Sequence, residues 1–545
     1  MAVQDIFADG IKSGWDVMNA SRLEDNSVFY TDVVIIGTGA GGGVAAEILT
    51  KAGLNVLMVE HGPLKSSNDF NMRESEAYAS LYQESGTRMN KAGSITVLQG
   101  RAVGGSTTVN WTSSFRTPSQ TLDHWAEKWD VTGCSLSDMA PWFEYMEKRL
   151  GIQPWQVVPN RNNAVLSQGC SALGYTWQTI LRNVRGCWNL GYCGMGCPTN
   201  AKQGMLVTTL PSALKNGGKL LFLCEAQKLE ISHGRATEVL CRAMANYGNT
   251  PLPIRIRIKA GHVVLSGGAI NTPALLLRSH APDPNGLLGK RTFIHPVAAS
   301  MSRFEEKIQA WEGAPQSVYS DQFQWKDGVN GVMGYKLEAL PLHPSLTAAL
   351  IPSRGRVLQE RMEQYPQTNC LLALLRDGFH EESQGGTIQL HDDGSAILDY
   401  NLDNYEWDGV RRALLTMAEI QFAAGAKEVL PLHQEAGYSR SWKACRNMIN
   451  ALSLEPYLTQ IGTAHLMGGC AMSDSPLKGV VNSWGGHHQL DNVSVMDGSV
   501  FPTSIGANPQ LSIYGLAAKW ASHLADQLLN NSHHVRSKEE SSALL

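Results

Sequence analysis

The 545-residue sequence has no long hydrophobic run, no excess of basic charge and few cysteines. No stretch of about 18 uninterrupted apolar residues occurs, which predicts no transmembrane helix. The start, MAVQDIFADGIKSGW, has no basic segment followed by an apolar core, so we expect neither a secretory nor a twin-arginine signal. A net charge of -4 without a long basic run gives no reason to expect nucleic-acid binding. We therefore expect a cytoplasmic protein, with membrane association or export beside a partner subunit as alternatives.

The ten cysteines are too few, in a chain of this length, for a disulfide scaffold. Seven are scattered, and we expect most of them to be small buried hydrophobes: Cys134, Cys170, Cys224, Cys241, Cys370, Cys445 and Cys470. The other three are Cys187, Cys193 and Cys197 in CWNLGYCGMGC, with the spacing C-x5-C-x3-C. Three thiols so close together raise the possibility of a metal, a disulfide or a redox relay.

A dinucleotide site is predicted near the N-terminus by TDVVIIGTGAGGGVAAEILTKAGLNVLMVEHG. An apolar strand over residues 33–36 is followed by Gly37, Gly39 and Gly42 in G-x-G-x-x-G spacing, and then by a helical segment to about Lys51. The first glycine permits the tight turn, the second lets the backbone approach a pyrophosphate, and the third lets helix and strand pack closely. The helix N-terminus then offers unpaired amides to the phosphates.

The segments that follow extend the same prediction. A second strand over residues 55–59 ends at Glu60, whose carboxylate can accept hydrogen bonds from an adenosine ribose. A second glycine-rich loop, GRAVGGSTTVNW, occupies residues 100–111, and residues 262–279 and 492–502 are apolar runs that end in glycine and polar residues. Such runs are expected where parallel strands deliver loops to a ligand. The spacing of apolar residues after 506 predicts a final helix.

Together these motifs resemble the glucose–methanol–choline (GMC) oxidoreductase family, whose members bind FAD and oxidise alcohols, and the resemblance covers nearly the whole chain. Residues 268–279 match the family's second signature, and His280 then stands where the family has glycine. The resemblance implies the following cofactor-binding residues: Gly37, Gly39, Gly42, Glu60, Arg101, Gly104, Gly105, Asn110, Asp497 and Gly498. It implies an α/β fold, with a Rossmann-like FAD-binding domain and an α+β substrate domain built on an antiparallel sheet.

The resemblance also implies a catalytic pair, His465 in TAHLMGGCAM and Asn508 in SIGANPQLS, the His–Asn form also found in cholesterol oxidases. Alcohol oxidation removes a hydroxyl proton and a hydride from one carbon, and flavin N5 can receive the hydride. Imidazole is suited to take the proton, and a neutral amide can orient the hydroxyl. We expect His465 to be the base and Asn508 to be the hydrogen-bonding partner that orients the alcohol hydroxyl. His295, in FIHP, is a lesser candidate for the cofactor region.

The three clustered cysteines allow several interpretations. Their spacing resembles the segment that holds a [3Fe–4S] cluster in FAD-dependent glucose and fructose dehydrogenases of the family, and thiolates are typical iron–sulfur ligands. Such a cluster at Cys187, Cys193 and Cys197 would pass electrons singly to a cytochrome or quinone-linked acceptor. A disulfide between Cys193 and Cys197 and three structural thiols are the alternatives, and long-chain alcohol oxidases have a similar C-G-x-G-C element.

The expected organisation places an extension at residues 1–29 and a discontinuous FAD-binding domain at 30–300 and 460–530. A substrate domain follows from 301–459, and a flexible tail from 531–545. Within the substrate domain, GTIQLHDDGSAILDYNL predicts a hairpin, and the stretch after it predicts a long helix ending at Gly425.

The functional expectation is an FAD-dependent alcohol dehydrogenase whose electrons leave through the cluster. The alternative is an alcohol oxidase that reduces O2 to hydrogen peroxide. The alcohol stays unassigned, with a slight leaning toward a hydrophobic one.

Overall fold

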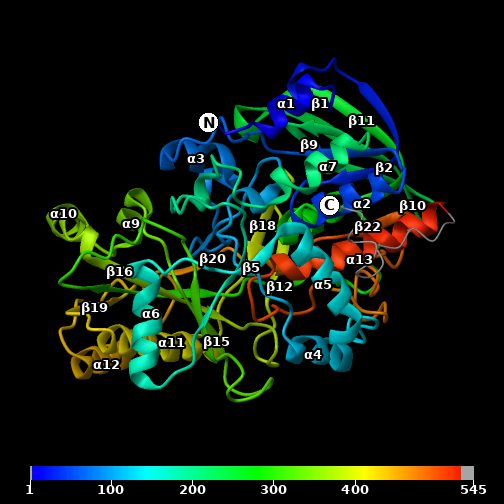
Figure 1. The fold of residues 1–545 in the computed structure, drawn as a ribbon. Coiled ribbons are helices and arrows are strands. Elements are labelled where there is room, and N and C mark those ends of the chain that lie inside the picture. The colour runs from blue at the N-terminus through cyan, green and yellow to red at the C-terminus, as the bar shows by residue number, and fades with distance from the viewer. Residues whose placement is uncertain (1–2, 530–545) are drawn as a thin grey trace.

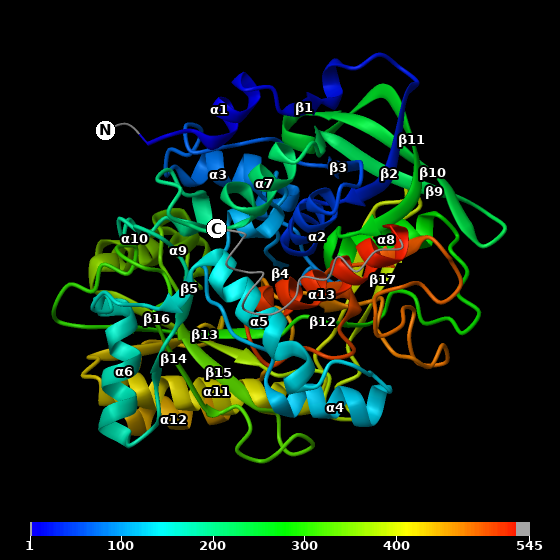
Figure 2. The same cartoon turned by 45° about the vertical axis from the view of Figure 1, so that its right-hand side comes forward.

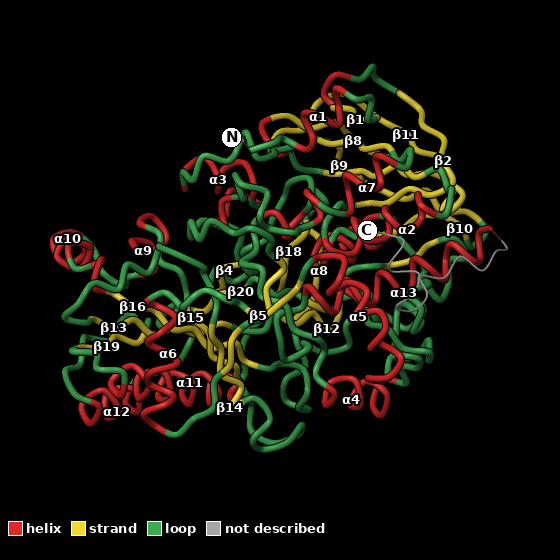
Figure 3. The backbone as a smooth tube through the Cα atoms, in the orientation of Figure 1, coloured by secondary structure: helices red, strands yellow, loops and turns green. Residues whose placement is uncertain are grey.

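The computed structural model describes residues 3–529 and contains two large sheets that lie side by side (Figure 1). The strands of the first sheet lie at the upper right of the view and those of the second at the lower left, with loops and a smaller sheet between them (Figure 3). The predicted tail at 531–545 lies outside the described residues. Within residues 3–529, no helix combines the length and apolar character that crossing a bilayer requires.

The first sheet is a Rossmann-like parallel sheet with an antiparallel extension. In order across the sheet it contains β1 (Asp16–Asn19), β8 (Lys219–Phe222), β3 (Val56–Glu60), β2 (Ser27–Ile36), β11 (Thr250–Leu265), β10 (Arg235–Ala245) and β9 (Cys224–Ser232), and β22 (Val493–Val495) also pairs with β11. All five residues of β3 are buried, as expected for a parallel strand covered on both faces. The predicted strands before Gly37 and Glu60 are therefore confirmed as neighbouring parallel strands.

Helices cover this sheet and complete its Rossmann-like architecture (Figure 2). They are α2 (Ala40–Lys51), α5 (Leu136–Leu150), α7 (Thr209–Lys215) and α13 (Gln510–Leu529). Helix α2 packs against both α7 and α13, so the helix that follows the glycine loop contacts the last helix of the chain. The final helix predicted after residue 506 is confirmed as α13.

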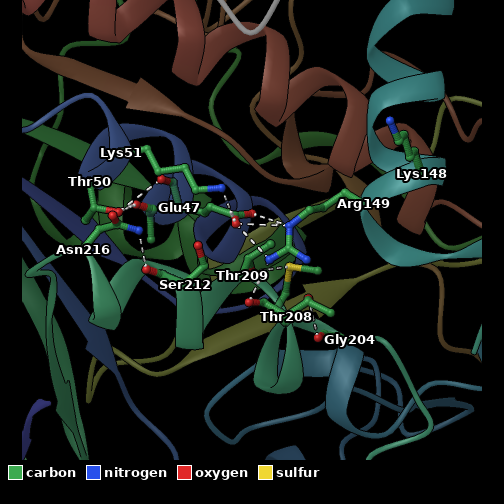
Figure 4. Close-up of polar contacts among 12 residues, drawn as sticks. Glu47, Thr50, Lys51, Lys148, Arg149, Gly204, Thr208, Thr209, Ser212 and Asn216 are labelled. Carbon is green, nitrogen blue, oxygen red and sulfur yellow. Dashed lines mark hydrogen bonds and ion pairs between the residues drawn. The ribbon is translucent and has the colours of Figure 1, made fainter. Parts of the chain in front are cut away.

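A buried ion pair ties α2 to α5 (Figure 4). The Glu47 side chain is 2% exposed and accepts hydrogen bonds from Arg149 Nε at 3.1 Å and Nη2 at 2.8 Å. Arg149 Nη2 also donates to the Thr208 carbonyl, and Lys51 Nζ lies 3.0 Å from Glu47 Oε1. Burial alone would raise the pKa of Glu47, but the hydrogen bonds and charge of Arg149, with Lys51, bring it below its ordinary value.

The second sheet is almost entirely antiparallel and carries helices on one face. Its order is β4 (Ile95–Val97), β20 (Ile461–Thr463), β13 (Val297–Arg303), β16 (Thr368–Leu375), β15 (Tyr335–Ala339), β14 (Val318–Phe323) and β6 (Gln178–Thr179), and β19 (Glu428–Pro431) also pairs with β13. The covering helices are α6 (Arg161–Leu173), α11 (Asn404–Ala423) and α12 (Trp442–Ala451) (Figure 3). Helix α11 ends two residues before Gly425, whose φ of +97° confirms the predicted helix end.

A small sheet joins the two halves. It contains β18 (Ala396–Asp399), β17 (Gly386–Leu390), β12 (Lys290–Phe293) and β21 (Met467–Gly468), and its first two strands form the predicted hairpin. The remaining helices and short strands are α1 (Ile6–Lys12), α3 (Glu74–Leu81), α4 (Ser119–Trp129), α8 (Gly268–Arg278), α9 (Pro344–Leu350), α10 (Gly355–Glu363), β5 (Ile152–Pro154) and β7 (Leu181–Asn183).

The mixed α/β fold thus agrees with the sequence-based expectation. His280 has a φ of +52°, so the turn after α8 keeps a left-handed residue although glycine is replaced.

Candidate active site

A single cavity of about 1200 Å³ is lined by residues from the two large sheets and from the loops between them. Of the ten residues expected to bind the cofactor, eight line this cavity: Gly37, Gly39, Glu60, Arg101, Gly105, Asn110, Asp497 and Gly498. The expected catalytic residues His465 and Asn508 line it as well. Gly37 and Asn508, which are 471 positions apart in the sequence, therefore line the same cavity.

At two positions of the nucleotide loop, the backbone makes contacts that only glycine permits. Gly37 has a φ of +101°, and a Cβ there would lie 2.3 Å from the Ser266 carbonyl oxygen. A Cβ on Gly42 would lie 1.9 Å from the Gly37 carbonyl oxygen, so Gly42 serves helix–strand packing and does not face the cavity. Within residues 3–529, no side chain caps the N-terminus of α2, so its first amides are available to an anionic ligand.

The second glycine-rich loop packs directly on the first. A Cβ on Gly105 would lie 2.6 Å from the Gly39 Cα, and Gly104 donates its N–H to Thr38 Oγ1 at 3.0 Å. The Thr38 hydroxyl in turn donates to Glu60 Oε2 at 2.6 Å. Gly104 thus supports the cavity wall through Thr38, a residue that the sequence motifs did not single out.

Glu60 and Asp497 are buried carboxylates that organise the loops around the cavity. Glu60 also accepts the Gly62 N–H at 2.9 Å, and burial raises the pKa of its carboxyl group. Asp497 accepts the Gly268 N–H at 2.8 Å and the Thr272 hydroxyl at 2.6 Å, which joins the last strand segment to the start of α8. Burial likewise raises the pKa of Asp497.

Two of the predicted cofactor contacts have unsatisfied polar atoms. Arg101 is 4% exposed, and its Nη2 donates to Asn249 Oδ1, but its Nε has no partner among residues 3–529. Asn110 Nδ2 donates to Gln510 Oε1 at 2.7 Å, while its Oδ1 is also buried without a partner in that range. Buried polar atoms of this kind usually have a partner, so they fit a polar ligand at this place.

His465 and Asn508 differ in their exposure and in their hydrogen-bond partners. His465 is half-buried with Nδ1 3.3 Å from Nδ1 of His295, and burial, followed by the charge of Lys336, lowers its pKa to about 4. The imidazole is therefore neutral at ordinary pH. Asn508 is 5% exposed; its Nδ2 donates to Glu338 Oε2 at 3.3 Å, and its Oδ1 is buried without a partner among the described residues.

Glu338 is a cavity residue that the sequence motifs missed. It is fully buried, lines the cavity, and leaves Oε1 without a partner in residues 3–529. Lys336, two residues earlier on β15, is also buried, and its Nζ lies 3.3 Å from the centre of the Phe115 ring. Burial raises the pKa of Glu338 to about 7 against the opposing charge of Lys336. The available signal was two charges at i and i+2 in the apolar strand GYKLEAL.

The structure gives no support to the predicted [3Fe–4S] cluster at the three clustered cysteines. Cys187 Sγ accepts the Asn189 N–H, Cys193 Sγ lies 3.7 Å from the Arg182 guanidinium, and Cys197 Sγ lies 3.4 Å from Thr199 Oγ1. Among residues 3–529, no three His, Cys, Asp or Glu side chains come together as a metal-holding group. All three cysteines are free thiols, and neither the cluster nor the alternative disulfide is supported.

The Rossmann-like sheet and the glycine loops at this cavity define a dinucleotide-binding protein. The family model described as GMC oxidoreductase matches residues 78–297 with its N-terminal part and residues 382–517 with its C-terminal part. A long-chain-alcohol oxidase of Arabidopsis thaliana is 30% identical over 92% of this chain and 69% of its own length. A GMC-type oxidoreductase of Sinorhizobium fredii is 28% identical over 98% of this chain and 100% of its own length. The chain belongs to the GMC oxidoreductase family.

Solved structures show the same fold. Pyridoxine 4-oxidase from Mesorbium loti superposes with a TM-score of 0.66 at 16% identity, over 90% of this chain and 99% of that one. A formate oxidase variant from Aspergillus oryzae RIB40, studied for FAD modification, gives a TM-score of 0.68 at 14% identity over 93% and 99%. With the family and these flavoproteins, the glycine loops, the uncapped α2 N-terminus and the unpaired Arg101 and Asn110 atoms fit FAD as the cofactor.

Proposed function

We propose that this protein is an FAD-dependent alcohol oxidase that acts on primary alcohols with long aliphatic chains and releases hydrogen peroxide. One observation carries the proposal: the cavity that contains both glycine loops also contains His465, Asn508 and an aliphatic wall. Relatives named long-chain-alcohol oxidases favour the oxidase over the dehydrogenase that the sequence suggested first.

The aliphatic wall comes from the uncovered face of the second sheet. Because side chains alternate between faces along a strand, residues two positions apart project together. Val297 and Ala299 of β13, and Leu372 and Leu374 of β16, line the cavity in this way. Leu340, which follows β15, and three residues of α9 extend the wall: Leu346, Ala349 and Leu350. A saturated hydrocarbon chain would bury apolar area against these side chains.

The polar end of the cavity would receive the hydroxyl group. His465 and Asn508 present a ring nitrogen and an amide there, and together they can hold an alcohol oxygen in one orientation. FAD, once bound, would supply the acceptor for the hydride, which carries both electrons of the oxidation. The chain's own contribution is then to position the carbinol carbon, exclude water and manage the hydroxyl proton.

The test measures peroxide and chain-length dependence in the purified flavoprotein. With air-saturated buffer, the oxidase proposal expects one hydrogen peroxide per alcohol oxidised. Turnover that requires an artificial dye, with little peroxide, would instead indicate the dehydrogenase. Each methylene buried on the wall contributes about 0.8 kcal/mol, so kcat/KM should rise about fourfold per methylene across a series of primary alcohols. A flat series would contradict the assignment of substrate class.

A further inference from the structure

The backbone places His295 opposite His465. Two connections cross from the small sheet to the second large sheet: residues 294–296 join β12 to β13, and residues 464–466 join β20 to β21. Strands β12 and β21 are antiparallel, with Thr292 opposite Gly468 and Phe293 opposite Met467. Continuing this register by two residues brings position 295 opposite position 465. The two imidazoles are therefore cross-strand neighbours of the kind found within a sheet.

Hydrogen bonds fix both connections. Asp377, which is fully buried, accepts the Ile294 N–H at 2.9 Å and the His295 N–H at 3.1 Å. The Thr463 hydroxyl donates to the Ile294 carbonyl and accepts the His465 N–H at 3.2 Å. His295 has a φ of +50°, a conformation that non-glycine residues rarely adopt without such support.

Counting protons between the two rings gives their tautomers. The two Nδ1 atoms are 3.3 Å apart, so one must carry the hydrogen and the other must accept it. Both rings are neutral, because burial lowers the pKa of each. A neutral ring has one hydrogen, and His295 Nε2 is buried with no partner among residues 3–529. If His465 were the Nδ1 donor, the hydrogen of His295 would sit on that buried nitrogen as an orphaned N–H, which proteins avoid.

We propose that His295 is a positioning residue that holds His465 in the tautomer with hydrogen on Nε2, so that His465 donates to the alcohol oxygen and Glu338 takes up the hydroxyl proton. His465 has an open side facing the cavity, so its Nε2–H can reach a ligand there. This reverses the sequence-based expectation that His465 is the base. The proton-transfer step rests on the proposed alcohol oxidation. The tautomer of His465 does not depend on that proposal.

Because His465 acts as a hydrogen-bond donor in this proposal, Glu338 is the group that accepts the hydroxyl proton. Asn508 Nδ2 engages Oε2, so the carboxylate presents the unpartnered Oε1. The Lys336 ammonium, on the same face of β15, favours the ionised form. In the step, the O–H bond breaks and its proton goes to Glu338. The C–H bond breaks with its electron pair, which bound FAD would accept as hydride, and the alcohol carbon becomes a carbonyl. In the proposed oxidase, O2 would then take up the two electrons and the two protons as hydrogen peroxide.

The decisive variants are His295→Asn and His295→Asp, which differ by one terminal atom. Both side chains tolerate a positive φ, so the backbone should be preserved equally. The amide can present an N–H to His465 Nδ1, whereas an ionised carboxylate can only accept from it. An accepting partner would move the hydrogen of His465 to Nδ1 and leave Nε2 as a lone pair.

The expected result is a loss of less than about tenfold in the flavin reduction rate for His295→Asn and of at least about 100-fold for His295→Asp. Flavin content and the thermal midpoint, measured in both, establish that the two variants are equally folded. A more active Asp variant, or an equal effect of both substitutions, would overturn the proposal because the direction of the hydrogen bond would then not matter.

A spectroscopic measurement separates this inference from the proposed function. In protein labelled with 15N-histidine, proton–nitrogen correlations show which ring nitrogen carries hydrogen, and His465→Gln identifies the signals of His465. Hydrogen on Nε2 of His465 supports the proposal even if no alcohol is oxidised, and hydrogen on its Nδ1 overturns it even if turnover is fast. Glu338→Gln should reduce the flavin reduction rate by at least about 100-fold; an unchanged rate would remove Glu338 as the acceptor.

Discussion

Removal of the Arg149 guanidinium should destabilise the nucleotide-binding half by about 3–5 kcal/mol, the cost of leaving a buried charge without its partner. Glu47, only 2% exposed, would lose the Nε and Nη2 hydrogen bonds, and Thr208 would lose a donor. Lys51 remains 3.0 Å from the carboxylate, but an i,i+4 pair contributes only about 0.3–0.5 kcal/mol and cannot compensate. Arg149→Met preserves much of the side-chain volume. The loss of unfolding free energy therefore reflects the missing charge more than lost packing.

The double variant Glu47→Met with Arg149→Met is the matched control. Replacing a buried ion pair by apolar groups of similar volume is often neutral or stabilising, so the double variant should lie within about 1 kcal/mol of the parent or above it. Urea unfolding followed by circular dichroism measures all the variants. A single variant as stable as the parent, or a double variant as unstable as the single one, would refute the reasoning.

The pH dependence of this effect has a definite sign. The pKa of Glu47 is lowered in the folded protein, so the pair stabilises the fold at pH values above the ordinary carboxyl pKa. That contribution disappears as the pH falls through the lowered pKa. In Arg149→Met, burial dominates and raises the Glu47 pKa, so the carboxyl group becomes protonated on mild acidification. The difference in unfolding free energy between parent and variant should therefore shrink as the pH falls.

Four further predictions concern the site. His465→Ala should retain FAD but reduce the flavin at least about 100-fold more slowly, and near-normal turnover would contradict its role. Gly41→Ala places a Cβ 1.5 Å from the Met496 carbonyl oxygen and should lower both the thermal midpoint and FAD retention, whereas Gly437→Ala, with open space around it, should change neither. Because Glu338 must be ionised to accept a proton, flavin reduction should rise as the pH rises through about 7, and Glu338→Gln should abolish that dependence. Anaerobically purified protein should contain flavin without iron, and a stoichiometric iron and sulfide content would restore the cluster at Cys187, Cys193 and Cys197.

The nucleotide-binding part could be predicted from sequence because its interactions are local. The strand before Gly37, the loop and helix α2 are contiguous, and the steric need for glycine at 37 and 42 was predicted from the motif spacing. The pairing of β2 with β3 follows from the same βαβ unit. The contact of Gly41 with Met496 could not be predicted, because it depends on how a segment 455 residues later in the chain packs against the loop.

The cysteines show what spacing alone leaves open. C-x5-C-x3-C fixes how close the thiols can come but not where they point. In the folded loop, Arg182 lies against Cys193, and the other two sulfurs contact Asn189 and Thr199. A cationic neighbour and divergent partners are properties of the packed loop, and no spacing rule contains them.

The sequence by itself determined the family, the FAD-binding architecture and the placement of His465 and Asn508 at the cavity, because motifs of fixed spacing carry steric and electrostatic requirements within a few residues. Only the tertiary structure decided which groups face those two residues. His295 reaches His465 through the register of β12 and β21, and Glu338 reaches Asn508 because β15 turns that side chain toward the cavity. The direction of a proton transfer depends on hydrogen-bond partners and burial, and both exist only after distant segments have packed together.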